Sequence, residues 1–219
     1  MIAEEGVAPD GRPMMHPLSR EEWRAWLQAN QASSQGVWLV SFKEATGKPR
    51  IDYDEAVEEL LCFGWVDSKP GKLDEERSLL WCAPRKARSG WSRPNKQRVE
   101  RLIAAGLMQE RGLAAIEAAK ANGSWTLLDT VEDLLLPEDL AAALAAAGSA
   151  ERWEAMSRSA RRGVLEWITQ ARRPETRAAR IQAAAEAAKD GRAANAWRPP
   201  TGGSPGSPSP SGPDTPLQG

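Results

Sequence analysis

The sequence predicts an α+β protein that is mainly α-helical, with a small antiparallel β-sheet in the N-terminal half and an Ala- and Arg-rich helical C-terminal half. Two short runs, GVWLVSFK from Gly36 and SLLWCA over 78–83, are rich in the β-branched and aromatic residues that favour strands. Elsewhere, apolar residues recur at helical spacing behind capping signals. With 219 residues, of which 41% are hydrophobic, the chain can bury a core in one ordinary domain or two small ones.

Capping boxes mark the helices of the N-terminal half. Ser19 with Glu22 predicts a helix that runs to about Gln31, because the hydroxyl and the carboxylate each satisfy a free backbone N–H. Asp52 with Glu55 forms the same pattern, and apolar residues at helical spacing follow it. The later helices are predicted from Pro or Ser near their starts and Gly or Asn-Gly after their ends; they begin near Pro94, Leu113, Pro137, Ser159 and Pro174.

Composition divides the chain into four parts. Residues 1–16 are expected to be a loose N-terminus, 17–135 an α+β core region, 136–190 a helical C-terminal region and 191–219 a disordered tail. The tail is almost entirely Pro, Gly and Ser from Pro199 onward, so it cannot bury enough surface to offset the entropy of ordering.

No apolar run approaches the roughly 20 residues that cross a bilayer, and the N-terminus is acidic rather than basic and then apolar. We therefore expect no membrane span and a cytoplasmic location. The chain has two cysteines, Cys62 and Cys82, and one histidine, His16. This inventory predicts no metal site, no cofactor and no histidine-based triad, and it identifies no catalytic residue.

The stretch WCAPRKARSGWSRPNKQRVER, residues 81–101, carries seven basic residues and one acidic residue, net +6. Basic residues mixed with tryptophan are typical of nucleic-acid binding. Residues 51–77, however, carry nine acidic and three basic residues, net −6. The two segments can neutralise each other, which disfavours a nucleic-acid function because such binding needs uncompensated positive charge.

A candidate pocket lies between these charge blocks. In CFGWVDS, residues 62–68, an apolar stretch runs directly into Asp67 and Ser68, and a carboxylate at the edge of a core needs partners. A guanidinium at Arg85 offers a two-point contact. The predicted ligand-binding set is Trp65, Asp67, Ser68, Arg85, Lys86, Trp91, Ser92, Asn95 and Lys96. The alternative is structural: Asp67 forms a turn or pairs with Arg85, and Ser92 or Asn95 caps the following helix.

Long ordered motifs resemble one known family. The chain contains GVWLVSFK, TGKP, YDEAVEELLCFGWVDS, KLDEERSLLWCAPRKARSGWSRPNKQRVERLIAAGLM and GLAAIEAAKANGSW, followed by PEDLAAAL and SRSARRGVLEWITQARRPETRAARI. Together these resemble the YdeI/OmpD-associated family, also called bacteriocin-protection proteins, over about residues 17–190. The resemblance implies a role in tolerance of bacteriocins or antimicrobial peptides, and an association with an outer-membrane porin. It supplies no reaction and no catalytic residue.

Three functions remain open from the sequence. We favour a non-enzymatic stress-protection protein that binds a peptide, a protein or a small anionic ligand. The first alternative is an enzyme of unassigned chemistry, in which Asp67 is the general acid or base and Arg85 or Lys86 stabilises negative charge. The second is nucleic-acid binding through residues 81–101. Eight Arg and four Glu between Glu151 and Arg180 indicate mainly a solvated helix face, which could also bind an anionic partner.

Overall fold

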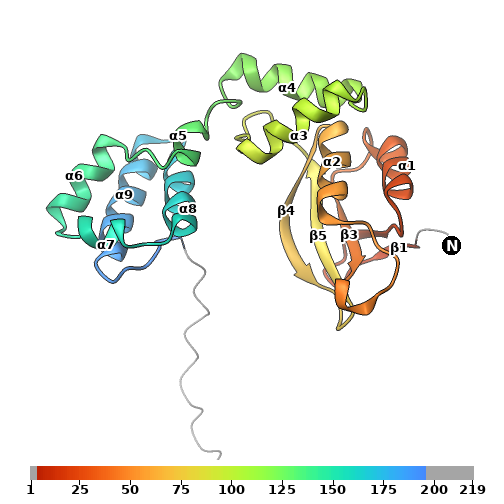
Figure 1. The fold of residues 1–219 in the computed structure, drawn as a ribbon, viewed down its shortest axis with the longest axis horizontal. Helices are drawn as coiled ribbons and strands as arrows, with labels where there is room; N and C mark the ends of the chain where they lie inside the picture. Colours follow the sequence, from red (N-terminus) through yellow and green to blue (C-terminus); the bar gives the residue numbers. More distant parts are fainter. Residues whose placement is uncertain (1–3, 196–219) are drawn as a thin grey trace, which may run out of the picture.

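The computed structural model describes residues 4–195, which form two lobes joined through helices α3 to α5 (Figure 1). The predicted disordered tail lies outside the described residues from 196 onward. The N-terminal lobe comprises β1 (Glu4–Val7), β2 (Pro13–His16), α1 (Arg20–Asn30), β3 (Val37–Phe42), the short 3₁₀ helix η1 (Glu44–Thr46), α2 (Tyr53–Cys62), β4 (Trp65–Lys72), β5 (Arg77–Pro84), α3 (Arg93–Ala104) and α4 (Glu110–Asn122). The C-terminal lobe comprises α5 (Asp129–Glu132), α6 (Glu138–Ala146), α7 (Ala150–Glu154), α8 (Arg158–Thr169) and α9 (Pro174–Ala188). The predicted α+β class is confirmed.

The sheet has five strands in the order β1-β2-β3-β5-β4. Strand β3 is buried on both faces: Val37 and Leu39 belong to the main core, whereas Trp38 and Val40 belong to a second cluster on the opposite face. This division follows from the two-residue period of a strand. Helices α1 and α2 pack on the main-core face.

The sheet is mixed rather than purely antiparallel, because β2 pairs parallel to β3. The antiparallel hairpin of β1 and β2 extends the edge of the sheet, with Glu5 opposite Met15. Residues 4–7 and 13–16 are therefore paired strands joined by a turn, where a loose N-terminus was expected. The hairpin was missed because β1 is only four residues long and its surroundings are rich in Gly and Pro.

Strand β4 was also missed. Its sequence, WVDSKPGK, has the Pro and Gly of a loop, yet it pairs antiparallel with β5 from Trp65 opposite Pro84 to Lys72 opposite Ser78. The register shifts between Asp67 and Lys69, so Ser68 is the extra residue of a bulge. An edge strand tolerates Pro because one side of it forms no ladder.

One predicted capping box is observed in full and the other in half, because the Glu22 carboxylate accepts the backbone N–H of Leu18 instead of that of Ser19. The Ser19 hydroxyl accepts the backbone N–H of Glu22 at the start of α1. Asp52 and Glu55 form the complete reciprocal box at the start of α2. The two helices then bury Trp23, Leu27 and Leu60 in the main core.

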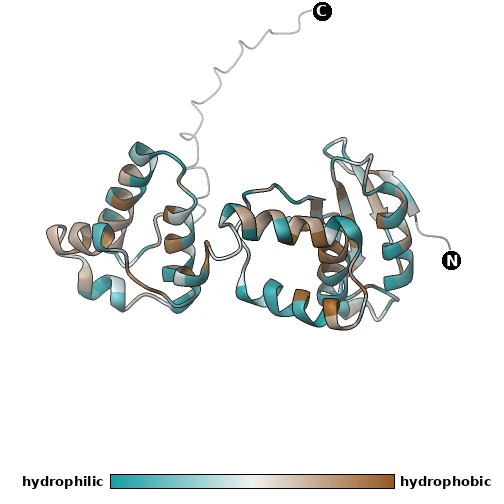
Figure 2. Cartoon of the chain, turned by 90° about the horizontal axis from the view of Figure 1, so that it is seen from above, coloured by the Kyte–Doolittle hydropathy of each residue, from teal (hydrophilic) through white to brown (hydrophobic). Residues whose placement is uncertain are grey.

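The C-terminal lobe has a hydrophobic core of its own, which includes Leu128, Leu140, Trp153, Ile168 and Ile181. Hydrophobic and hydrophilic residues alternate along its helices (Figure 2), and the buried ones form this core. The Ser149 hydroxyl is buried there and donates to the carbonyl of Ala185, which ties α7 to α9. Because this core already includes Leu128, it begins before residue 136, where the predicted helical region starts.

Candidate ligand cleft between the lobes

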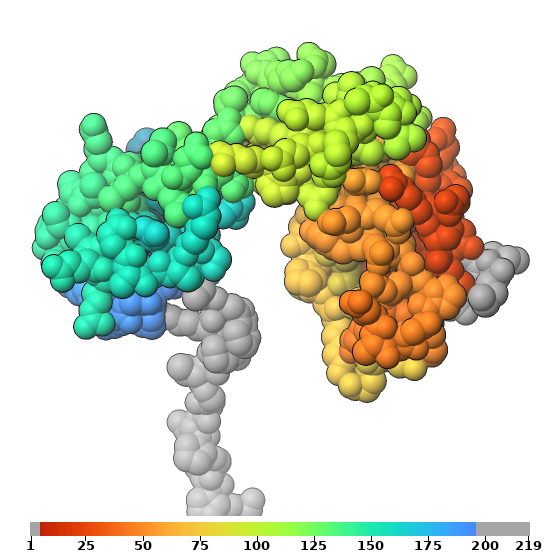
Figure 3. Space-filling view, viewed as in Figure 1, coloured from red at the N-terminus to blue at the C-terminus, as the bar shows by residue number. Residues whose placement is uncertain are grey.

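The molecule is hollowed between the two lobes, below the bridge of helices (Figure 3). A cleft of about 960 Å³ lies at this junction. Its walls come from β4, from the 85–90 loop, from the link between α4 and α5, and from the end of α8; its polar lining residues include Asp67, Ser68, Arg85, Arg88, Ser89, Asn122, Ser124, Glu166, Thr169, Gln170 and Arg172. Both lobes contribute, so this polar cleft exists only in the folded arrangement of the two.

Arg85 follows the last residue of β5, and its backbone N–H donates to the carbonyl of Gly64 at 3.0 Å. Its guanidinium lies over the ring of Trp91, with the central carbon 3.8 Å from the ring centroid. The Nη2 atom donates to the carbonyl of Gly90 at 2.5 Å. The buried Nε and Nη1 atoms have no hydrogen-bond partner among residues 4–195.

The Arg85 guanidinium therefore has two N–H donor atoms, Nε and Nη1, that no described residue satisfies. Burial lowers the pKa of Arg85 to about 10, against a smaller opposing effect of the Asp67 carboxylate. Arg85 therefore stays protonated at neutral pH. A part-buried cation whose buried donors are unpaired costs stability unless something satisfies them.

Asp67 does not supply that partner. Its Oδ2 accepts the hydroxyl of Tyr53 at 2.9 Å, and no ion pair within the described chain joins Asp67 to Arg85. The two-point contact expected between them does not form. Burial first, and the charge of Asp67 second, raise the pKa of Tyr53 to about 12, so its hydroxyl is a proton donor in this pair at neutral pH.

A smaller hollow of about 430 Å³ adjoins the cleft and shares Val66, Asp67, Arg85, Gly90 and Glu166 with it. It reaches the start of α3, where Ser92, Asn95 and Arg98 line it. Ser92 is the N-cap residue of α3, but its side chain makes no capping hydrogen bond.

The structure brings together only part of the predicted set. Asp67, Ser68, Arg85, Ser92 and Asn95 line the two hollows. The remaining four do not: Trp65 is in the core, Trp91 is buried beneath Arg85, Lys86 is exposed outside the lining, and Lys96 pairs with Asp129.

The remaining polar groups of the cleft were missed because they come from distant parts of the chain. Asn122 and Ser124 each donate to the carbonyl of Ala87, which anchors the 85–90 loop. Arg88 and Arg172 line the cleft, and neither forms an ion pair with any residue of the described chain. The Asn-Gly-Ser sequence after α4 was read only as a helix stop.

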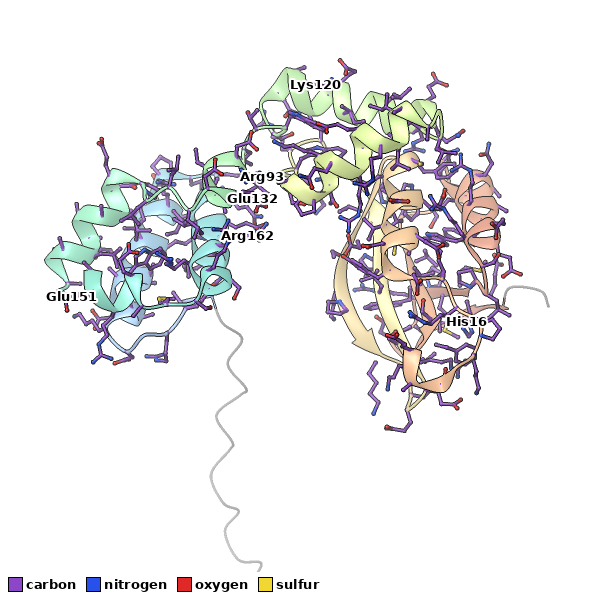
Figure 4. All side chains as sticks on the ribbon, in the orientation of Figure 1. His16, Arg93, Lys120, Glu132, Glu151 and Arg162 are labelled. Atoms are coloured by element: carbon purple, nitrogen blue, oxygen red, sulfur yellow. The ribbon has the colours of Figure 1, made fainter. Side chains whose placement is uncertain are left out.

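Four of the seven basic residues of the 81–101 stretch form ion pairs. Arg98 pairs with Asp54 at 2.6 Å and Arg101 with Glu58 at 3.3 Å, both in the acidic segment. Arg93 and Lys96 pair with Asp133 and Asp129 near α5. Arg93 and the Glu132–Arg162 pair are labelled in Figure 4, on the facing sides of the two lobes. These ion pairs engage the basic residues of 93–101, so they leave no continuous basic surface for a nucleic acid; Arg85, Lys86 and Arg88 form no ion pair with the described residues.

Carboxylates also line the cleft, but they are engaged. Glu166 pairs with Arg162 at 2.9 Å and accepts the side-chain amide of Gln170 at 3.0 Å. Of the charged lining residues that form no ion pair with the described chain, three are cationic, Arg85, Arg88 and Arg172, and one, Asp67, is anionic. Among residues 4–195, no group of three His, Cys, Asp or Glu side chains is placed to hold a metal ion, and no helix is long and apolar enough to span a bilayer.

Two different family models match the two halves of the chain. Residues 133–191 match the family model described as bacteriocin-protection, YdeI or OmpD-associated. Residues 15–115 match a model described as a domain of unknown function, DUF8412. Searches for similar curated proteins and for similar solved structures found no match. The resemblance predicted from the sequence is thus confirmed for the C-terminal helical region.

Proposed function

We propose that this chain, whose residues 133–191 form a YdeI/OmpD-associated domain, is a bacterial stress-protection protein that acts by binding a small anionic ligand between its two lobes. The protective role comes from the family description. The ligand class comes from the chemistry of the cleft. A cytoplasmic location, and hence an indirect link to any outer-membrane porin, are parts of the same proposal.

One observation carries the ligand assignment: Arg85 has two buried, unpaired guanidinium nitrogens beside a cleft. A carboxylate or phosphate oxygen would satisfy them with charge-assisted hydrogen bonds. The contact of Arg85 with Trp91 and its hydrogen bond to Gly90 restrict the guanidinium in advance, so little side-chain entropy is lost on binding.

The volume of the cleft and its other hydrogen-bond donors are consistent with a small ligand. A volume of about 960 Å³ suits a small molecule rather than a folded partner. Arg88 and Arg172 supply further positive charge, while Ser89, Thr169 and Gln170 supply neutral hydrogen-bonding groups. Both lobes would contact such a ligand.

The two alternatives have less support. An enzyme using Asp67 as a general base and Arg85 as its partner needs the two groups to act on one substrate, and Asp67 is instead paired with Tyr53. A nucleic-acid function needs a free basic surface, and residues 93–101 are paired with acidic side chains.

Anion binding can be tested with inorganic phosphate and citrate as probes, with glucose as a neutral control, by calorimetric titration at constant ionic strength. Arg85→Met removes the charge and keeps an unbranched apolar chain against Trp91. Lys86→Met is the matched control, because Lys86 is the adjacent cation and lies outside the lining. We expect wild type and Lys86→Met to bind at least one anion, and Arg85→Met to bind it about tenfold more weakly or worse. Equal binding by Arg85→Met would contradict the proposal.

A stability measurement separates binding from folding. Because Arg85 is part-buried with unmet donors and makes no ion pair with Asp67, Arg85→Met should be as stable as wild type without ligand, within about 1 kcal/mol. The coupling energy between Asp67→Ala and Arg85→Ala should be below about 0.5 kcal/mol in a double-mutant cycle. A coupling of several kcal/mol would instead make the pair a structural tie.

The protective role has its own assay. Bacteria that express wild type, Arg85→Met or Lys86→Met are challenged with a bacteriocin, and survival is counted. We expect wild type and Lys86→Met to protect equally and Arg85→Met to lose protection. Protection that persists in Arg85→Met would separate the role from the cleft.

A further inference from the structure

A second hollow lies in the C-terminal lobe and shares no lining residue with the cleft. It is a groove of about 490 Å³ between α6 and α7, lined by Leu136, Ala141, Leu144, Ala150, Glu151, Trp153 and Glu154. Glu151 is labelled at the outer end of this lobe, away from the facing side that carries Glu132 and Arg162 (Figure 4). We define these seven residues as the α6–α7 groove.

The groove has a rigid apolar floor. Leu144 and Trp153 are buried and belong to the core of the lobe. The Ser149 hydroxyl, between the two helices, is fixed to Ala185 of α9. The floor is therefore part of the folded core, and it does not have to be ordered when a partner binds.

Two exposed leucines stand at the edge of the groove. The exposed fractions of Leu135 and Leu136 are 57% and 37%. Leu134 before them has φ of 54°, a left-handed conformation that usually falls to glycine. Its N–H bonds to Val131, and that of Leu135 bonds to Thr130, which is the Schellman pattern at the end of α5. Leu134 thus adopts a conformation that is unfavourable for leucine, and the two residues that follow this turn, Leu135 and Leu136, are exposed.

The charged side chains that line the groove are both acidic. The two charged residues in the groove lining are Glu151 and Glu154, and the first turn of α6 adds the exposed Glu138. Glu154 is paired with Arg161 at 2.5 Å, whereas Glu151 makes no ion pair within the described chain. An apolar trough with a negative rim complements an apolar surface with positive flanks.

We infer that the α6–α7 groove binds a basic amphipathic helix of a partner protein or peptide, with its apolar face on Leu136 and Trp153 and its lysines or arginines beside Glu151. Helix-in-groove recognition uses apolar side chains spaced three and four residues apart, which match a short trough between two helices. Anionic lipid fits less well because the glutamates repel it. The inference goes beyond the cleft and does not depend on it.

The test uses a fluorescently labelled synthetic helix of about 18 residues, with leucines on one face and lysines on the other. An otherwise identical peptide with glutamates in place of the lysines controls for charge. Anisotropy is measured with the full chain. The groove variants are Leu135→Ser with Leu136→Ser, and Glu151→Lys. The matched controls on the other lobe are Leu113→Ser, whose side chain is 43% exposed, and the exposed Glu100→Lys.

We expect the basic peptide to bind wild type, Leu113→Ser and Glu100→Lys alike, and each groove variant about tenfold more weakly or worse. The acidic peptide should not bind. Arg85→Met should leave peptide binding unchanged, so that failure of the groove and failure of the cleft are distinguishable. Three results would overturn the inference: equal binding of both peptides, undiminished binding by the leucine variant, or binding of phosphatidylglycerol vesicles in preference to the basic peptide.

Discussion

Glu59 lies in the core of the N-terminal lobe with only 2% of its side chain exposed, and it bonds to two arginines of α1. Its two carboxylate oxygens accept from Arg20 at 2.7 Å and from Arg24 at 2.6 Å. A buried carboxylate is tolerated only because both cations reach it. One acidic side chain thus fixes α2 against α1.

Replacing Glu59 by Gln should lower the free energy of unfolding by roughly 3 kcal/mol, because two part-buried guanidinium groups lose their counter-charge. Its neighbour Glu58 pairs with Arg20 and Arg101 but has 20% of its side chain exposed. Glu58→Gln should therefore cost less than about 1 kcal/mol. Urea denaturation of the two variants compares them directly, and similar losses would refute the role given to burial.

Tyr53 is the only tyrosine in the 219 residues, so tyrosinate absorbance near 295 nm reports this one group. With its pKa raised to about 12, the native midpoint should lie well above the value of about 10 expected for the unfolded chain. Because the folded pKa is the higher one, the associated stabilisation is present below pH 10 and is lost as the pH rises through 12. Asp67→Asn should lower the native midpoint, though not to 10, because burial is the larger cause. A midpoint unchanged in Asp67→Asn would contradict the Tyr53–Asp67 hydrogen bond.

At the scale of single residues, the sequence predicts the hydrogen bonds that a side chain forms with residues close to it in the chain. The Ser19 and Asp52 caps are three residues from their partners, and both form. The partner of Asp67 was assigned to Arg85, whereas the structure gives it to Tyr53, fourteen positions away on α2. Pairing between a strand and a helix depends on tertiary geometry, which a charge pattern does not encode.

Two helical glycines show how the packing of a helix decides whether a position tolerates a larger side chain. A Cβ on Gly112 of α4 would lie 2.3 Å from the carbonyl oxygen of Cys62, at the end of α2. A Cβ on Gly163 of α8 would meet only the side-chain nitrogen of Asn195, at 3.5 Å. The close approach of α4 to α2 therefore requires glycine, and the position on α8 does not.

Gly112→Ala should lower the free energy of unfolding by roughly 3 kcal/mol, since backbone must move to admit the methyl group. Gly163→Ala should raise it by about 0.5–1 kcal/mol, because alanine favours the helix and fits without a clash. Chemical denaturation of the same substitution at both sites measures the difference. If Gly112→Ala were neutral, α4 would not pack on α2 as described.

Elements are predictable where their pattern is local and regular. The helices with clear caps and the two apolar strands follow from period and propensity. Strand β4 carries Pro70 and Gly71, and it becomes a strand because β5 lies beside it. The β1–β2 hairpin likewise depends on β3, which pairs with Met14 and Met15. Tertiary pairing overrides weak local preference in both cases.

The cleft belongs to the whole molecule, because its lining joins residues near positions 67, 85, 122 and 170. The link between the lobes is compact: Gly90 lies so close to Leu128 that a Cβ there would be 2.8 Å from it. Lys96–Asp129 and Arg93–Asp133 add ion pairs across the same junction. Hydrophobic periodicity predicts the helices and strands of each lobe but not how the lobes are placed relative to each other. Arg85 could therefore be proposed from the sequence, whereas Arg88 and Arg172, which line the same cleft, could not.

Two separate cores joined by a small, partly ionic junction should unfold in two steps. We expect calorimetry to resolve two transitions, and the glycine variants to assign them. Gly112→Ala should lower the midpoint temperature of the N-terminal transition by roughly 10 °C and leave the other in place, whereas Gly163→Ala should raise only the C-terminal midpoint by a few degrees.

High salt should separate the two transitions further, because it weakens the ion pairs of Arg93 and Lys96 across the junction. An anion bound in the cleft contacts both lobes and should draw the transitions together, in wild type but not in Arg85→Met. A single transition that moves with either glycine variant would mean that the lobes fold as one unit.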